Sequence, residues 1–326
     1  MPSPDFLTLA QSVINGTPAS ETDLRQLIDL PETAVFNMLP GANLIRDTFF
    51  GNRVHLCVIC NGKSGKCSED CAFCAQSTHF NTRVDTYPLL PEDQLQQGAE
   101  DLKGTPVNRY SIVTSGRGLP DNEIDAVCRA CDGIGNGEID LCASLGIISE
   151  DGLQKLAGAG VSRYHHNLES ARSHFPHICS THTYDQRVNT VKAAQRAGMS
   201  VCSGGIFGMG ETNEQILELA LELKDLDVDA VPLNFLSPIP GTPLEKTDHL
   251  TPLKCLKIIA LFRYVLPDKP ILICGGREAN LGMLQPMIFF AGASGIMTGN
   301  YLTTHGPAME NDLDMLEQLG LVPDRS

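Results

Sequence analysis

The chain has 326 residues, 42% of them hydrophobic, and a formal net charge of −15. This length is within the range of a single α/β barrel, which typically takes about 250 residues before additions. The acidic balance argues against a nucleic-acid-binding surface, which needs a basic stripe, and no apolar run approaches the roughly 20 residues of a membrane span.

The first expected elements are helices that precede the main domain. Residues 1–50 have helical periodicity, clearest in "DLRQLI" (23–28), and are expected to form an N-terminal helical extension. The rest of the chain, 51–326, is expected to form one barrel domain with a C-terminal tail, because it contains no low-complexity segment and no obvious linker.

Strands and helices alternate through this second part. Amphipathic stretches such as 184–197 and 211–226 have the helical period and begin near the capping residues Thr183 and Thr212. Alternation repeated to eight strands predicts an α/β fold, a (β/α)8 barrel of the TIM type. A doubly wound open sheet is the alternative, but no G-x-G-x-x-G follows the first strand. The expected strands are 55–61, 109–116, 138–146, 163–169, 200–208, 230–236, 270–276 and 295–301.

The loop after the first expected strand, "KCSEDCAFCAQS" (66–77), holds three cysteines: Cys67, Cys71 and Cys74. In a barrel it opens at the C-terminal ends of the strands, where active sites of such barrels lie. Cysteine thiolates bind iron–sulfur clusters, normally four to a cluster, so three thiolates leave one iron free for a small molecule. The alternative is a zinc site with a distant fourth ligand, although zinc sites usually pair cysteines as C-x2-C.

This C-x3-C-x2-C spacing, with Phe73 before the last cysteine, resembles the radical S-adenosylmethionine enzymes. The resemblance narrows to the biotin synthase family, whose motifs keep their order and spacing here over residues 50–320. It implies a [4Fe-4S] cluster on the three cysteines, S-adenosylmethionine at the open iron, dethiobiotin as substrate, a flavodoxin- or ferredoxin-like electron donor, and a homodimer. The motifs are "CSEDCAFCAQS", "YHHNLES", "THTYDQRVNT", "VCSGGIFGMGET", "PLNFLSPIPGTPL", "GGRE" and "YLTT".

The resemblance also implies roles for single residues. Phe73 matches an aromatic residue against the adenine of S-adenosylmethionine, and Glu169 replaces an aspartate that holds the ribose hydroxyls. Arg187 and Asn234 match further contacts to this cofactor. Asn167 matches a residue at the ureido ring of dethiobiotin, where an amide both donates and accepts hydrogen bonds. The other implied substrate contacts are Lys63, Thr303 and Thr304. For each polar residue the alternative is a hydrogen-bonded structural role.

Sulfur insertion needs a sulfur donor, and the resemblance implies an auxiliary iron–sulfur cluster. In the familiar biotin synthases this is a [2Fe-2S] cluster held by three cysteines and an arginine. Cys142 and Cys202 match two of these cysteines, but the third position is Ser111 and the arginine position is Leu272. A two-iron cluster with the familiar ligands is therefore not expected.

A four-cysteine cage is the expected replacement. Inward residues of a barrel form layers of four contributed by alternate strands, and the first, third, fifth and seventh expected strands carry Cys57, Cys142, Cys202 and Cys274. Cys60 lies three residues after Cys57 and is expected to face the opposite side of the strand. Four thiolates favour an auxiliary cluster of the four-iron type; burial as small hydrophobic side chains is the alternative.

The remaining cysteines and two histidines are less specific. Cys128 and Cys131 lie on an expected helix, where packing is favoured over a zinc knuckle. Cys179 lies in a His-rich stretch, "SHFPHICSTH", which indicates either a weak metal site or a surface loop. His165 and His166 are neighbours on an expected strand, so they should point to opposite faces and are poor joint ligands.

Two observations bear on location and on alternative functions. Twelve cysteines, with no basic region leading into an apolar core at the N-terminus, predict a reducing compartment, by default the cytoplasm.

The alternative functions are another radical enzyme of the same branch, such as a hydrogenase-cofactor maturase, and a non-catalytic metal-binding protein. Lys63, Asn167 and the Thr303–Thr304 pair argue against the first of these alternatives.

Overall fold

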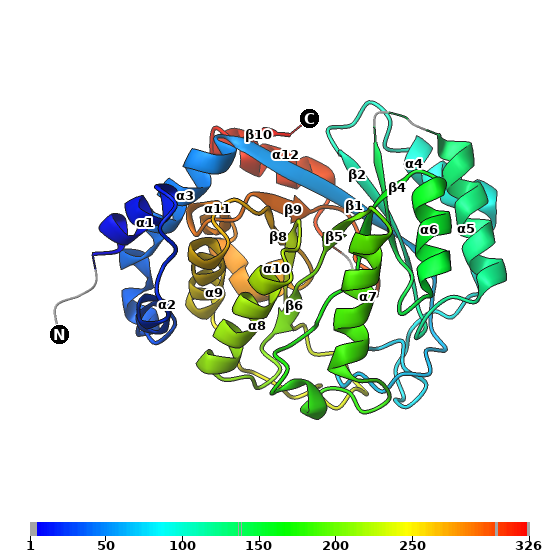
Figure 1. Ribbon diagram of the computed structural model, residues 1–326, viewed down its shortest axis with the longest axis horizontal. Coiled ribbons are helices and arrows are strands. Elements are labelled where there is room, and N and C mark those ends of the chain that lie inside the picture. The colour runs from blue at the N-terminus through cyan, green and yellow to red at the C-terminus, as the bar shows by residue number, and fades with distance from the viewer. Residues whose placement is uncertain (1–4, 136, 138, 304–305, 325–326) are drawn as a thin grey trace.

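Parallel strands form the centre of the molecule, and helices surround them (Figure 1). The structure, a computed structural model, describes residues 5–135, 137, 139–303 and 306–324. Each of the eight expected strands is present, the fifth as two short pieces. The strands are β1 (Arg53–Lys63), β2 (Arg109–Thr114), β3 (Asp140–Ser144), β4 (Val161–His165), β5 (Ser200–Cys202), β6 (Gly205–Phe207), β7 (Val231–Phe235), β8 (Ile271–Ile273), β9 (Gly295–Met297) and β10 (Val322–Pro323).

The sheet closes into a barrel. Its strands are hydrogen-bonded in the order β5-β4-β3-β2-β1-β9-β8-β7-β6, so the two ends of this path are consecutive pieces of the chain. The bridges Cys202–Ala230 and Glu169–Gly205 tie those pieces to the strands on both sides. The predicted TIM-type α/β barrel is confirmed, and β10 pairs with the beginning of β1 off the main path.

The break in the fifth strand has a steric cause. Gly204 lies between β5 and β6, and a Cβ atom added to it would lie 1.9 Å from the carbonyl oxygen of Pro232. Only a glycine lets two backbones approach this closely. The same approach brings the Gly204 N–H to the side-chain oxygen of Asn167, which accepts its hydrogen bond at 3.2 Å.

Helices cover the outside of the barrel and begin where capping residues predict. Thr183 and Thr212 each exchange two hydrogen bonds with the glutamine three residues later, which satisfies N–H groups of the first turn. The elements are α4 (Glu92–Glu100), α5 (Asp121–Ile134), α6 (Glu150–Gly158), η2 (Phe175–His177), α7 (Tyr184–Arg196), α8 (Asn213–Asp225), α9 (Pro252–Val265), α10 (Arg277–Leu281), η3 (Gly282–Leu284), α11 (Met287–Phe290) and α12 (Met309–Gln318).

Residues 5–50 form helices that pack beside the barrel, at the left of Figure 1. They contact α9, whose residues from Cys255 to Val265 are all buried. The Tyr264 hydroxyl lies 3.1 Å from the carbonyl oxygen of Phe6 and 3.3 Å from that of Met38. The extension therefore covers an apolar helix of the barrel wall. Its elements are α1 (Phe6–Ile14), α2 (Glu21–Ile28), η1 (Glu32–Asn37) and α3 (Leu39–Phe50).

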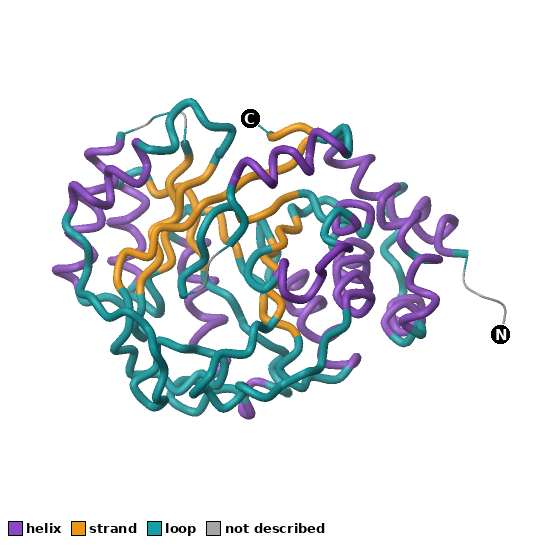
Figure 2. The backbone as a smooth tube through the Cα atoms, turned by 180° about the vertical axis from the view of Figure 1, so that it is seen from behind, coloured by secondary structure: helices purple, strands orange, loops and turns teal. Residues whose placement is uncertain are grey.

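Long loops gather at one end of the barrel, along the lower edge of Figure 2. The loop between β1 and α4 and the segment between β4 and α7 are the two that position the site described below. Among the described residues, no helix has the length and apolar character needed to cross a membrane.

Candidate active site

A cavity of about 400 Å³ opens among these loops. Its walls come from the three-cysteine loop (66–77), from the ends of β4 and β7, and from the segments after β8 and β9. Thr304 lies outside the described residues. The predicted site residues that line the cavity are Cys67, Cys71, Phe73, Cys74, Asn167, Glu169, Arg187, Asn234, Cys274 and Thr303.

Backbone hydrogen bonds fold the three-cysteine loop back on itself. The Cys67 N–H donates to the carbonyl oxygen of Gln76 at 2.9 Å, and its own carbonyl accepts from Thr78 at 2.8 Å. The Cys74 N–H donates to the Cys71 carbonyl at 2.9 Å. Burial raises the pKa of the Cys74 thiol to about 11, so a thiolate there needs a neighbouring positive charge. The iron of a cluster held by Cys67, Cys71 and Cys74 would supply that charge, and three thiols on one loop fit such a cluster.

The two acidic residues of this loop attach it to residues 179–182, here called the anchoring segment. Asp70 Oδ1 accepts backbone N–H groups of Ser180 at 2.9 Å and Thr181 at 3.2 Å. Burial opposes its ionisation, but these bonds and the one from the Ser180 hydroxyl hold the pKa of Asp70 below its usual range. Glu69 Oε2 accepts from His182 Nδ1 at 2.5 Å. The sequence analysis assigned no role to Glu69 or Asp70. Two carboxylates inside a cysteine loop could have been noticed as candidates for attaching that loop to another segment.

Arg187 and Glu169 meet in the cavity wall. Arg187 Nη1 lies 3.4 Å from Glu169 Oε1 and 2.9 Å from the carbonyl oxygen of Asn167, while its Nε donates to His182 Nε2 at 2.9 Å. Glu169 Oε2 is buried without a hydrogen-bond partner among the described residues, and burial raises the pKa of Glu169. A buried acceptor without a partner at a cavity wall suits the hydroxyl group of a ligand.

Glu169 also has an unusual backbone conformation. Its φ is 69°, in the left-handed region that non-glycine residues rarely adopt. Such conformations persist where the surroundings impose them, often at functional sites. Here the Glu169 N–H donates to Gly204 and its carbonyl accepts from Ile206, so two backbone bonds to the broken fifth strand hold it.

The two asparagines are oriented by backbone groups. Asn234 Oδ1 accepts the Gly275 N–H at 2.9 Å, and its Nδ2 donates to the Gly205 carbonyl at 3.3 Å. Asn234 therefore links the segment after β8 to β6. Asn167 is held through its Oδ1 by Gly204. Both side chains are fixed before any ligand arrives.

Lys63 does not lie where the resemblance implies. It is not among the cavity-lining residues, and its Nζ forms an ion pair with Glu123 Oε2 on α5 at 2.5 Å. The register of β1 against β2 shifts between Asn61 and Lys63. Irregularities of this kind can re-aim a side chain at the end of a strand.

His165 and His166 also differ from expectation, because both line the cavity. β4 ends at His165, so the alternation of a strand does not extend to His166. In each ring Nε2 is buried without a partner among the described residues. Burial lowers the pKa of His165 to about 3 and that of His166 well below its usual value, so both rings are neutral at neutral pH.

Three cysteines of the expected cage lie together in the barrel interior. Cys57, Cys202 and Cys274 belong to one buried cluster, whereas Cys142 on β3 is buried but is not a member of it. Each of the four is at most 3% exposed. The hydrogen bond to Cys57, followed by burial, raises the pKa of Cys274 far above its usual value. Cys60 belongs instead to the main core outside this cluster, as expected from its spacing.

Two arginines supply positive charge beside these thiols. Arg109 Nη1 lies 3.8 Å from Cys142 Sγ, and Arg109 Nε is buried without a partner among the described residues. Burial raises the pKa of Cys142 and raises that of Cys202 to about 12, while Arg109 and Arg163 oppose both increases. Four thiolates with two guanidinium groups nearby fit a cluster that carries negative charge.

The turn "GMGET" (208–212) borders the site and depends on one carboxylate. Glu211 is buried, and its two oxygens accept the N–H groups of Gly208 at 2.7 Å and Met209 at 2.8 Å. We expect Glu211→Ala to lower the free energy of unfolding by about 1–3 kcal/mol, because two buried donors lose their acceptor. Urea denaturation of the purified protein measures the change.

The matched control is Glu214→Ala, three residues further along the chain. Glu214 is about half exposed and pairs with Arg25 at 2.6 Å. An exposed ion pair contributes little to stability because solvent screens it, so this variant should unfold nearly as the parent does. Equal losses in the two variants would show that the turn does not depend on Glu211.

Two family profiles match the chain. Residues 63–223 match the Radical SAM superfamily, and residues 232–322 match the Biotin and Thiamin Synthesis associated domain. The first range contains the three-cysteine loop and the anchoring segment. The second contains Asn234, Cys274 and Thr303.

Curated relatives match over nearly their whole length. The chain is 52% identical to the biotin synthase of Desulfatibacillum aliphaticivorans, with 97% of this chain and 96% of the relative covered. It is 50% identical to the biotin synthase of Trichlorobacter lovleyi, with 97% and 95% covered. The biotin synthase of Geobacter sulfurreducens is 49% identical, with 96% of each chain covered.

Solved structures share the fold at much lower sequence identity. A methylornithine synthase superimposes with a TM-score of 0.85 at 22% identity, covering 97% of each chain. A maturase of the [FeFe]-hydrogenase superimposes with a TM-score of 0.83 at 16% identity, covering 100% of this chain and 76% of the maturase. At such identities the likeness shows the barrel alone and does not distinguish among reactions.

Proposed function

The chain belongs to the biotin synthase family of radical S-adenosylmethionine enzymes, and on this premise we propose that it converts dethiobiotin to biotin by inserting sulfur. The observation that supports this most directly is the meeting of three cysteines, the implied cofactor contacts and Asn167 around one cavity. An enclosed cavity suits radical chemistry, because a carbon radical must be kept from solvent and side reactions.

Cys67, Cys71 and Cys74 would hold the [4Fe-4S] cluster, which supplies the electron that cleaves S-adenosylmethionine and so starts hydrogen abstraction. The chain's own residues bind and orient the cofactor. Glu169 presents its unpaired Oε2 to the ribose hydroxyls, and Arg187 holds the other oxygen of that carboxylate. Phe73 and Asn234 complete this wall of the cavity.

The proposal includes an auxiliary cluster of the four-iron type as the source of sulfur. Its ligands are Cys57, Cys142, Cys202 and Cys274, all buried. The familiar two-iron site is not supported, because Leu272 occupies the arginine position in the same buried cluster. The four proposed ligands come from β1, β3, β5 and the residue after β8.

Further parts of the proposal rest on the family resemblance. They are a homodimer, a flavodoxin- or ferredoxin-like electron donor, and a cytoplasmic location. Thr303 lines the cavity and is proposed to contact the carboxylate end of dethiobiotin. Sedimentation of the purified protein and reduction by each carrier test the first two.

Asn167→Ala is expected to impair dethiobiotin binding more than S-adenosylmethionine binding. Removing the amide leaves a ureido group without its buried partner, at a cost of about 1–3 kcal/mol or about 5- to 150-fold in affinity. Equilibrium dialysis with each ligand measures the two affinities, and single-turnover assays measure biotin.

Asn167→Asp separates substrate contact from structural support. The aspartate keeps an acceptor for the Gly204 N–H but loses the amide donor. It should therefore keep the Gly204 N–H paired and still weaken dethiobiotin binding. If both variants bind dethiobiotin like the parent, Asn167 has a structural role and the substrate assignment loses its main support.

A further inference from the structure

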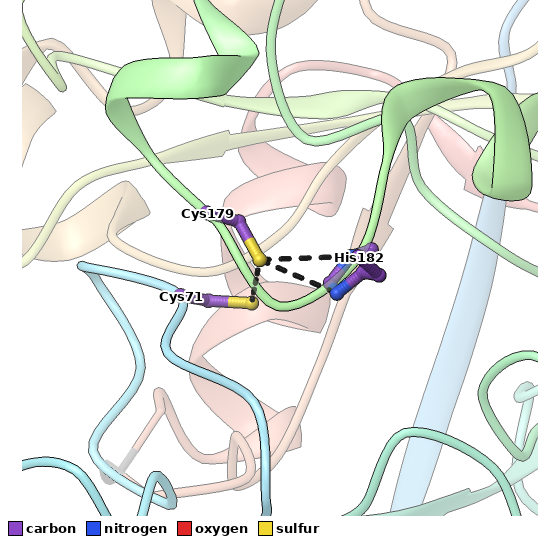
Figure 3. A group of neighbouring side chains, drawn as sticks. All are labelled: Cys71, Cys179 and His182. Carbon is purple, nitrogen blue, oxygen red and sulfur yellow. Dashed lines mark hydrogen bonds between the residues drawn. The ribbon is translucent and has the colours of Figure 1, made fainter.

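Three metal-binding side chains meet at one side of the cavity: Cys71, Cys179 and His182 (Figure 3). Cys71 comes from the three-cysteine loop, and the other two come from the anchoring segment. All three are buried, and their ligand atoms lie within 4.8 Å of one another. Within the described part of the chain, no other group of three His, Cys, Asp or Glu residues is this compact.

The distances match those of a single tetrahedral ion. Two thiolates bound to zinc at about 2.3 Å lie about 3.8 Å apart at the tetrahedral angle, and Cys71 Sγ and Cys179 Sγ are 3.8 Å apart. A thiolate and an imidazole nitrogen on one zinc ion lie about 3.6 Å apart. Cys179 Sγ lies 3.3 Å from His182 Nδ1 and 3.9 Å from Nε2. Cys179 therefore needs little movement relative to Cys71 or His182 to share an ion with either of them.

The short distance between the Cys71 and Cys179 sulfur atoms differs from the spacing expected between two ligands of a four-iron cluster. In a four-iron cluster each thiolate binds its own iron, so two cluster ligands lie farther apart than two ligands of one ion. Cys179 is also outside the C-x3-C-x2-C motif. The Cys71–Cys179 pair is therefore suited to one metal ion.

Two neighbouring carboxylates contact the ligands. Asp70 Oδ1 accepts the hydrogen bond of the Cys179 thiol at 3.2 Å, and this proton leaves when the thiolate binds an ion. Glu69 lies 2.5 Å from His182 Nδ1, which leaves Nε2 to face the metal. A carboxylate behind a histidine in this way is a usual support of metal-bound imidazole. Arg187 now donates to Nε2 and would keep its bond to the Asn167 carbonyl when an ion takes that place.

We propose that Cys71, Cys179 and His182 bind one thiophilic divalent ion, such as zinc, in the chain that has not yet received its three-cysteine cluster. Three protein ligands leave a fourth position open, so the ion is exchangeable. Cys71 cannot serve the ion and the cluster together. The ion therefore holds the loop to the anchoring segment and must leave before the cluster is assembled.

The test uses cobalt(II) and zinc with the full chain, prepared anaerobically without clusters and with reduced thiols. Cys142→Ala and Cys202→Ala are present throughout to remove the cage as a competing site. We expect one cobalt per chain, with the strong visible absorption of tetrahedral cobalt thiolate. Cys179→Ala should abolish that absorption, whereas Cys67→Ala and Cys74→Ala should retain it. Glu69→Gln should weaken binding about 10- to 100-fold.

Cys255→Ala is the matched control, because Cys255 is fully buried in α9 and outside the site. It should bind cobalt like the parent. Zinc loaded first should prevent iron uptake by the three-cysteine loop in the parent and leave uptake normal in Cys179→Ala. Unchanged cobalt absorption in Cys179→Ala, or its loss in Cys67→Ala, would overturn the proposal. Neither result depends on the reaction with dethiobiotin.

Discussion

Cys71→Ala is expected to abolish the cleavage of S-adenosylmethionine under reducing conditions. The three thiols of the loop line one cavity, and two thiolates are too few to hold a cluster that already has one iron without a cysteine. Cys67→Ala and Cys74→Ala should behave in the same way. The measurement is 5′-deoxyadenosine, quantified by chromatography after anaerobic reaction with dithionite.

Cys128→Ala provides the comparison for this loss. Cys128 lies on α5, is partly exposed, and is far from the three-cysteine loop in the sequence. It should form 5′-deoxyadenosine at the rate of the parent. Continued formation of 5′-deoxyadenosine by Cys71→Ala would rule out this loop as the site of the radical-generating cluster.

Iron content is expected to be about eight atoms per chain, since two four-iron clusters are proposed. The triple variant with alanine at positions 67, 71 and 74 should keep about half of this iron, with a four-iron signal in its Mössbauer spectrum. Adding Cys142→Ala or Cys202→Ala should remove that signal. With the loop cysteines intact, Cys142→Ala should still cleave S-adenosylmethionine but form no biotin.

Cys60→Ala is the control for the cage. Cys60 lies on β1 like Cys57 but belongs to the core outside the cage, so its removal should leave the iron content unchanged. A two-iron signal in the triple variant would refute the four-iron proposal and leave the biotin synthase assignment in place. Absence of any second cluster would remove the proposed source of sulfur.

The barrel could be predicted because both kinds of element leave a pattern in the neighbouring residues of the sequence. The strands are short apolar runs. Helices such as α7 begin at a threonine cap, which is visible in the sequence. The inward position of Cys57, Cys202 and Cys274, which share one buried cluster, could be predicted for a related reason. Alternation along parallel strands determines which side chains face inward, so Cys57 and Cys60 could be assigned to opposite sides before the structure.

Features that depend on irregular backbone could not be predicted. His166 follows the last residue of β4, so strand alternation does not apply to it. Lys63, which the resemblance implied as a substrate contact, stands at a register shift at the end of β1. The meeting of Cys71 with Cys179 joins segments 108 residues apart. No local pattern encodes such a contact, since it depends on how two loops fold over the same end of the barrel.

Hydrogen bonds connect the three-cysteine loop to Arg187, the proposed contact to S-adenosylmethionine: Glu69 bonds to His182, and His182 bonds to Arg187. Any free energy by which a filled loop steadies Arg187, and so strengthens the binding of S-adenosylmethionine, must return as equally tighter binding of the cluster when S-adenosylmethionine is bound, because linkage between two sites is reciprocal. An enzyme saturated with its cofactor should therefore bind its cluster most tightly at equilibrium.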